Sequence, residues 1–171
     1  MKLSISSINQ TKREGFKLID SVAGKDIDFV FDLEKFPWTQ IKDNSVEEVY
    51  IYHYAEYAKD LVKFMEEVYR ICEDEAKVTI VAPYYTSLAA WQDPTVVRPI
   101  SEATWACFQK TWREVHKSSR HAMKCDFEVT NMIVYFNEPW NQKSEEARRF
   151  AQSHYWNAVS EILTELKVKK A

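Results

Sequence analysis

The chain has 171 residues, of which 46% are hydrophobic and 29% are charged, and this composition excludes a disordered or fibrous protein. The formal net charge of -3 argues against a dedicated binder of nucleic acid or of anionic membranes. Three widely spaced cysteines, Cys72, Cys107 and Cys125, predict neither a disulfide framework nor a zinc site, and we expect no other metal site.

The chain has no apolar run long enough to span a bilayer, and its first residues lack the apolar segment of a signal peptide. We therefore expect a cytoplasmic protein, where unpaired cysteines stay reduced. The length fits a single domain over residues 1–171, large enough to bury a hydrophobic core.

The first third of the chain alternates short apolar runs with polar turns. These runs predict strands at residues 2–8, 16–20, 27–33 and 47–53. Acidic residues stand at or near the ends of the second and third of these strands, at Asp20 and Asp32.

The hydrophobic period then changes from two residues to about 3.6. Apolar residues between Leu61 and Cys72 fall on one face of a helix that we expect to begin near residue 58. Residues 77–82 predict a fifth strand, which Pro83 ends, and an irregular segment follows to Pro99.

The last third adds two helices and at least one strand. Ser101 is a suitable N-cap for a helix to about residue 119, and residues 124–136 predict a long strand. A helix from 144 to about 157 follows, and residues 159–168 fit either its continuation or a last strand. The alternation predicts an α/β protein with a mostly parallel sheet and an antiparallel edge.

A stripe of basic residues recurs at helical spacing after Trp105. We favour a solvated helix face, while a phosphate or nucleic-acid contact, with Trp105 and Trp112 stacking, is the alternative. A pI near 5.9 makes nucleic acid the weaker partner. The stripe consists of Lys110, Arg113, His116, Lys117, Arg120, His121 and Lys124.

Several short motifs occur in a characteristic order. They are the first strand and loop Leu3 to Ile8, the segment Asp43-Asn44-Ser45-Val46-Glu47-Glu48-Val49-Tyr50, His53 with Glu56, Arg70, and Asp93-Pro94-Thr95 with Arg98. With these motifs in this order, the chain resembles the class I S-adenosylmethionine-dependent methyltransferases, specifically the small type 11-like group. The resemblance implies a Rossmann-like fold with S-adenosylmethionine as cofactor.

The resemblance also implies site residues. Asp20 would accept hydrogen bonds from the cofactor ribose, Asp32 and Leu33 would flank the adenine, and His53 would face the methionine part or the substrate. The cofactor-binding set is Ser6, Ser7, Ile8, Asp20, Asp32, Leu33 and His53. The substrate side would consist of Tyr84, Tyr85, Asp93 and Arg98. No catalytic residue is identified, and the methyl acceptor is unknown.

The departures from the family pattern fall at demanding positions. Ser6 and Ile8 stand where the family has glycines, and the whole chain has only two glycines. Glycine permits the tight turn and the close approach of the backbone to the ligand. Tyr57 and Val96 replace histidines of the family motifs. We therefore predict weak binding of S-adenosylmethionine.

Three functions remain open from the sequence. The first is a methyltransferase that tolerates the altered loop. The second is a catalytically inactive pseudo-methyltransferase that acts as a protein-binding or regulatory partner. The third and weaker option is a protein that binds a different nucleotide or a phosphorylated ligand. Asp20 and Asp32 can equally be turn-forming carboxylates, and His53 can be a structural, half-buried histidine.

Overall fold

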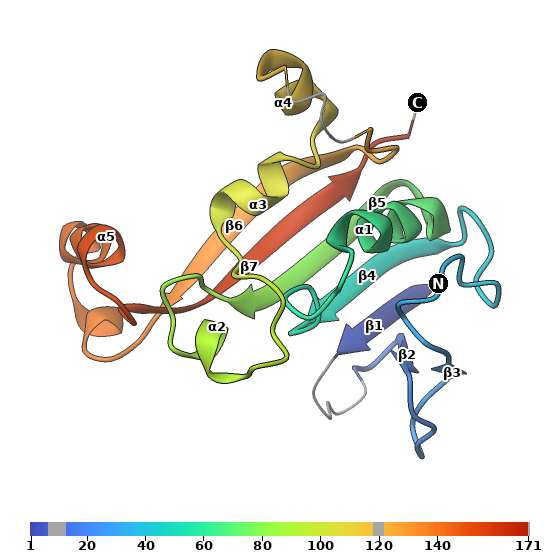
Figure 1. The fold of residues 1–171 in the computed structure, drawn as a ribbon, viewed down its shortest axis with the longest axis horizontal. Coiled ribbons are helices and arrows are strands. Elements are labelled where there is room, and N and C mark those ends of the chain that lie inside the picture. The colour runs from blue at the N-terminus through green and yellow to red at the C-terminus, as the bar shows by residue number, and fades with distance from the viewer. Residues whose placement is uncertain (7–12, 118–121, 171) are drawn as a thin grey trace.

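A seven-stranded sheet forms the centre of the computed structural model, which describes residues 1–6, 13–117 and 122–170 (Figure 1). The strand order is β3-β2-β1-β4-β5-β7-β6. The first five strands of that order run parallel, and β7 is antiparallel to both β5 and β6. The predicted α/β class with an antiparallel edge is confirmed. The strands are β1 (Lys2–Ser6), β2 (Phe16–Asp20), β3 (Phe29–Val30), β4 (Val46–Tyr52), β5 (Cys72–Pro83), β6 (Phe127–Phe136) and β7 (Val159–Val168).

The predicted strands differ from the observed ones mainly in length. The third strand was expected over 27–33, but β3 pairs with β2 through Phe29 and Val30 alone. Residues 159–168, which fitted a helix or a strand, form β7 between β5 and β6. Buried and partly exposed residues alternate in β7, since every second residue from Ile162 to Val168 is buried. Successive side chains of a strand point to opposite faces of the sheet, and one face of β7 is covered.

The longest helix, α1 (Leu61–Ile71), is capped by Asp60, whose side chain accepts a hydrogen bond from the Lys63 amide at 3.0 Å. Its apolar stripe is buried against the sheet. Figure 1 shows α1 and α3 over the same face of the sheet. The other helices are α2 (Ala89–Gln92), α3 (Glu102–Ala106), α4 (Lys110–Val115), η1 (Trp140–Gln142) and α5 (Glu145–His154). None of the helices in the described ranges is long and apolar enough to cross a membrane.

The prediction of one helix from 101 to about 119 was wrong. The chain forms α3, a break at residues 107–109, and then α4. The break follows from tertiary contacts, because Phe127 at the start of β6 donates its amide to the Phe108 carbonyl at 3.1 Å. Asp126 accepts the Lys110 amide at 2.7 Å. Trp105 is 1% exposed and belongs to the core, so its ring is not available to stack on a ligand.

The segment between β3 and β4 has no helix but still covers the core. Trp38 is 2% exposed, and its ring lies 5.7 Å from that of Phe64 on α1. The buried carboxylate of Glu67 accepts the Trp38 amide at 2.6 Å. Arg70 bonds to Glu67 and donates to the carbonyls of Trp38 and Ile41. These contacts fix the segment on α1.

Candidate functional site

The carboxyl ends of the parallel strands meet at one edge of the sheet, which is where α/β proteins bind ligands. Ser6 ends β1, Asp20 ends β2, and His53 follows β4 directly. Tyr84 follows β5. The fold therefore brings these predicted residues to one edge. Ser7 and Ile8 lie outside the described residues.

Both strand-end acids make hydrogen bonds within their own turns. Asp20 Oδ1 accepts the Val22 amide at 3.0 Å. Asp32 Oδ1 accepts the Glu34 amide at 3.0 Å, and Asp32 Oδ2 lies 3.6 Å from Lys35 Nζ. Each acid thus forms a carboxylate-capped turn. Asp20 Oδ2 keeps capacity for a further bond, since it has no partner within the described part of the chain.

Leu33 lies inside the molecule. Its side chain is 5% exposed and belongs to the hydrophobic core. Its carbonyl accepts the indole N–H of Trp38 at 3.3 Å. The side chain is thus engaged in packing under the edge of the sheet, with little surface left for an adenine ring.

His53 lies between two carboxylates. Its Nε2 is 2.8 Å from Glu161 Oε1, and its Nδ1 is 3.3 Å from Glu56 Oε1. Burial lowers the pKa of His53, but the hydrogen bonds and charges of Glu161 and Glu56 outweigh burial and raise the pKa to about 9. The ring is therefore an imidazolium at neutral pH. An imidazolium has no free lone pair and cannot accept a proton from a substrate.

The carboxyl group of Glu56 is buried beside His53. Its side chain is 2% exposed, and neither Oε1 nor Oε2 has a hydrogen-bond partner within the described ranges. A buried carboxylate is costly unless a cation compensates for it, and the His53 imidazolium supplies that charge. Glu161 was missed by the sequence analysis because it lies 108 residues from His53, and only the β5–β7 pairing brings it to this edge.

The four residues predicted for the substrate side fall into two groups. Tyr84 is buried and donates its hydroxyl to Glu102 at 2.9 Å. Arg98 donates to the backbone carbonyls of residues 58 and 59. Asp93 remains near the surface and accepts the hydroxyl of Tyr57 at 3.0 Å, and Tyr85 is 38% exposed. Tyr84 and Arg98 thus support the site, while Asp93 and Tyr85 face its surface.

An aromatic surface extends this edge beyond the predicted residues. It joins the segment after β5 to the segment before β7 through Trp91 and Trp156, whose rings lie 6.4 Å apart. Asn157 Oδ1 accepts the Leu88 amide at 3.1 Å and so holds the two segments together. The sequence analysis missed this surface because exposure depends on the tertiary fold. Its exposed members are Tyr85, Leu88, Trp91, Val97, Phe150, Tyr155 and Trp156.

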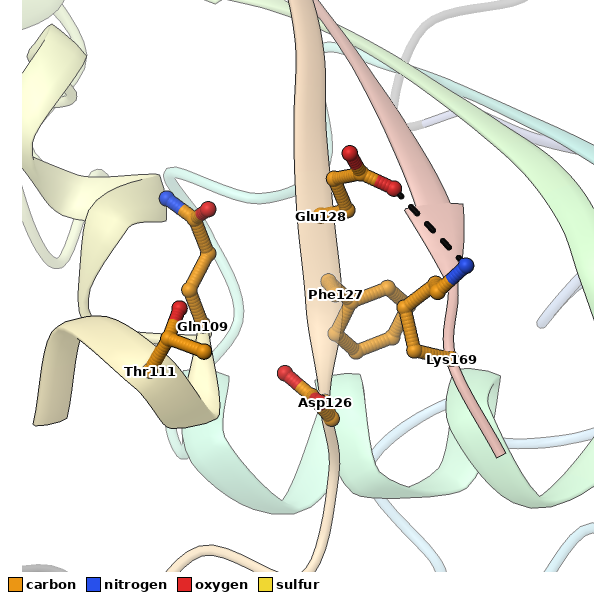
Figure 2. Close-up of a pocket in the computed structure, with 6 residues that line it drawn as sticks. All are labelled: Gln109, Thr111, Asp126, Phe127, Glu128 and Lys169. Atoms are coloured by element: carbon orange, nitrogen blue, oxygen red, sulfur yellow. Dashed lines mark ion pairs between the residues drawn. The ribbon is translucent and has the colours of Figure 1, made fainter. Parts of the chain in front are cut away.

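Pockets occur at both ends of the sheet. A pocket of about 200 Å³ beside the aromatic surface is lined by residues 90–99, including Trp91 and Asp93. A larger pocket of about 390 Å³ lies at the opposite end, between α4 and the start of β6 (Figure 2). Within the described ranges, no group of three or more His, Cys, Asp or Glu residues is arranged to hold a metal ion.

No protein-family model matches the sequence, and no curated protein matches it. Solved structures with a similar fold do exist. The partner of the Trm112 methyltransferase activator in a complex from Haloferax volcanii has 16% identity and a TM-score of 0.58, over 99% of this chain and 83% of that one. An S-adenosylmethionine-dependent methyltransferase from Archaeoglobus fulgidus has 15% identity and a TM-score of 0.56, over 97% and 85%. The [4+2]-cyclase SpnF has 8% identity and a TM-score of 0.57, over 99% and 76%.

Proposed function

We propose that this chain, which has the class I methyltransferase fold, is an S-adenosylmethionine-dependent methyltransferase with weakened cofactor binding. The observation that carries the proposal is the strand order β3-β2-β1-β4-β5-β7-β6 with Asp20 at the end of β2. An acid at this strand end is the group that nucleotide-binding α/β proteins use for the ribose hydroxyls.

The carboxyl edge fits the cofactor in part. Asp20 Oδ2 can accept one ribose hydroxyl while Oδ1 keeps its bond to the Val22 amide. His53 stands at the end of β4 with its ring fixed by Glu161. S-adenosylmethionine would supply an activated methyl group on a sulfonium. The protein would supply mainly position, which accounts for a large part of catalysis in such displacements.

Three features support weak binding. Leu33 is packed in the core, and Asp32 is engaged by Glu34 and Lys35. The third feature is the loop that would approach the cofactor, where Ser6 and Ile8 replace the glycines of the family pattern. A β-branched residue disfavours the left-handed backbone. Together these features should reduce the free energy of cofactor binding by about 3 kcal/mol, which corresponds to about a hundredfold in affinity.

The aromatic surface would form the acceptor side of the site. It adjoins the pocket at residues 90–99 through Trp91, and an exposed apolar patch of this kind marks a binding surface. An acceptor with an apolar or ring-bearing face would contact Trp91 and Trp156. Because His53 is an imidazolium, the acceptor must reach the site as a nucleophile that needs no proton removal by this residue.

A second function is a pseudo-methyltransferase that binds a protein partner through the aromatic surface. The hydrogen bond of His53 to Glu161 and its ion pair with Glu56 favour it, because an imidazolium held in this way does not act as a base. Tyr and Trp are enriched at protein interfaces. The similar structure from Haloferax volcanii is in complex with an activator protein, and the similarity to a [4+2]-cyclase illustrates that this fold hosts other functions.

Calorimetric titration with S-adenosylmethionine and S-adenosylhomocysteine tests the proposal. We expect saturable binding with a Kd about a hundredfold weaker than in a double variant Ser6→Gly/Ile8→Gly. Asp20→Asn should weaken binding about tenfold further, while Asp26→Asn, an exposed acid away from the strand end, should not. Absence of heat in both the native chain and the glycine variant, with the protein folded, would instead favour the pseudo-methyltransferase.

A further inference from the structure

The amino end of the sheet carries a second pocket of about 330 Å³, here called the basic pocket. It lies where β6 begins and β7 ends. In the β5–β7 ladder Lys167, near this pocket, pairs with Lys77, and Glu161, the partner of His53, pairs with Pro83. The six residue steps from Lys167 to Glu161 correspond to about 20 Å at a rise of roughly 3.3 Å per residue. The charged side chains that line it are Lys110, Arg113, Lys124, Asp126, Lys169 and Lys170.

Arg113 is held in place by neutral groups. Its Nη1 donates to the Cys107 carbonyl at 3.1 Å, and its Nη2 donates to the Cys125 carbonyl at 2.8 Å. Neither bond neutralises the guanidinium, and no salt bridge of Arg113 occurs within the described residues. The pocket therefore contains a fixed cation whose charge is not compensated, and a planar guanidinium recognises phosphate oxygens well.

Two lysines supply further positive charge without ion pairs. The ammonium groups of Lys110 and Lys124 have no acid partner in the described part of the chain. Their backbone amides do bond to acids: Lys110 to Asp126 at 2.7 Å, and Lys124 to Glu66 at 2.8 Å. The carboxylates of Asp126 and Glu66 are thus partly satisfied by backbone N–H groups. The ammonium groups of Lys110 and Lys124 and the guanidinium of Arg113 therefore give the pocket a net positive charge.

The remaining two lysines are already engaged at its border. Lys170 Nζ donates to the Asn44 side chain and to the Arg70 carbonyl. Lys169 Nζ lies 2.5 Å from Glu75 Oε1 and 3.8 Å from Glu128 Oε2. Figure 2 shows Lys169 directed toward Glu128 in the neighbouring pocket of about 390 Å³. The charged residues that line that neighbouring pocket are two acids, Asp126 and Glu128, and one lysine, Lys169. An anion therefore fits the basic pocket and not the neighbouring one.

We propose that the basic pocket binds a small phosphate-bearing molecule, with Arg113 as the fixed contact and Lys110 and Lys124 closing on the phosphate. The cavity volume suits a ligand of phosphate to mononucleotide size. Nucleic acid is the poorer match, because a long anionic backbone would also run past Glu66 and Glu128 and would meet a chain of net charge -3. This inference does not depend on the proposed methyltransferase function.

The test uses the full chain and inorganic pyrophosphate as the probe in calorimetric titration at low ionic strength. We expect saturable one-to-one binding. The double variant Lys110→Glu/Lys124→Glu should weaken it tenfold or more. The charge-matched control Lys25→Glu/Lys143→Glu changes two exposed lysines outside the pocket and should change affinity less than about twofold, since remote surface charges are screened. Circular dichroism verifies that all variants fold.

Four results would overturn the proposal. The first is the absence of saturable heat for pyrophosphate in the native chain. The second is equal weakening in the control variant, which would show diffuse attraction to surface charge. The third is a single-stranded RNA of 20 nucleotides that displaces pyrophosphate and binds more tightly, which would assign the pocket to nucleic acid. Binding that survives in Lys110→Ala/Lys124→Ala at full strength would likewise exclude the two lysines as contacts.

Discussion

His53 and Glu161, which lie 108 residues apart in the chain, share a hydrogen bond of 2.8 Å across the carboxyl end of β5. The backbone fixes both partners, because the His53 amide donates to the Val81 carbonyl and Glu161 pairs with Pro83 in the β5–β7 ladder. His53 itself has a left-handed φ of 49°, which is uncommon for a residue other than glycine. The strained backbone and the paired ring belong to one structural unit that ties β4 to β7.

The pairing of His53 predicts a stability that depends on pH. A pKa raised from 6.5 to about 9 stabilises the fold fully below pH 6.5, and this stabilisation is lost as the pH rises through about 9. The shift corresponds to at most about 3 kcal/mol, and solvent near the partly exposed Glu161 reduces it to about 2 kcal/mol. Urea unfolding at pH 7 and pH 10 measures the difference.

The variant Glu161→Gln serves as the control for that measurement. It keeps the shape of the side chain and removes the charge, so the free energy of unfolding should fall less between pH 7 and pH 10 than in the native chain. Equal falls in the two proteins would mean that other groups, such as tyrosines, account for the alkaline loss.

The sequence predicted the order of the elements better than the chemistry of the site. Strand ends at Asp20 and His53 followed from local apolar patterns, and they lie at the expected edge. The partners that decide their properties could not be predicted in the same way. Glu161 reaches His53 only through sheet pairing. The break after α3 depends on the hydrogen bond from Phe127 to the Phe108 carbonyl, a long-range contact that overrides the local helical period.

Glu67 should be the most sensitive acid in the fold. Its buried carboxylate accepts the Trp38 amide at 2.6 Å and the Arg70 Nε–H at 2.9 Å. Glu67→Ala would leave the Arg70 guanidinium without its main partner and the Trp38 amide unsatisfied, at a cost of about 3 kcal/mol in the free energy of unfolding. Urea unfolding measures the loss. The neighbouring Glu66→Ala, whose residue is only partly buried, should cost less than half as much; equal costs would contradict the assigned role.

Glu75, the fourth residue of β5, has a left-handed φ of 62°. Glycine adopts this conformation without a steric penalty, and the exposed ion pairs of Glu75 with Lys167 and Lys169 contribute little in water. Glu75→Gly should therefore raise Tm in differential scanning calorimetry. Glu73→Gly, where the backbone is not left-handed, should lower it. A lower Tm for both variants would mean that the ion pairs outweigh the backbone strain.

Trp105 and Trp156 should differ sharply when each is replaced by alanine. Trp105 is 1% exposed and its ring lies 6.1 Å from Phe108, so truncation opens a cavity and costs about 4 kcal/mol in the free energy of unfolding. Trp156 is 68% exposed and contacts Trp91 at the aromatic surface, so its truncation should cost less than about 1 kcal/mol. Urea unfolding of the two variants gives both values. A large decrease in the free energy of unfolding for Trp156→Ala would mean that the aromatic surface stabilises the fold. That result would contradict its assignment as a binding surface.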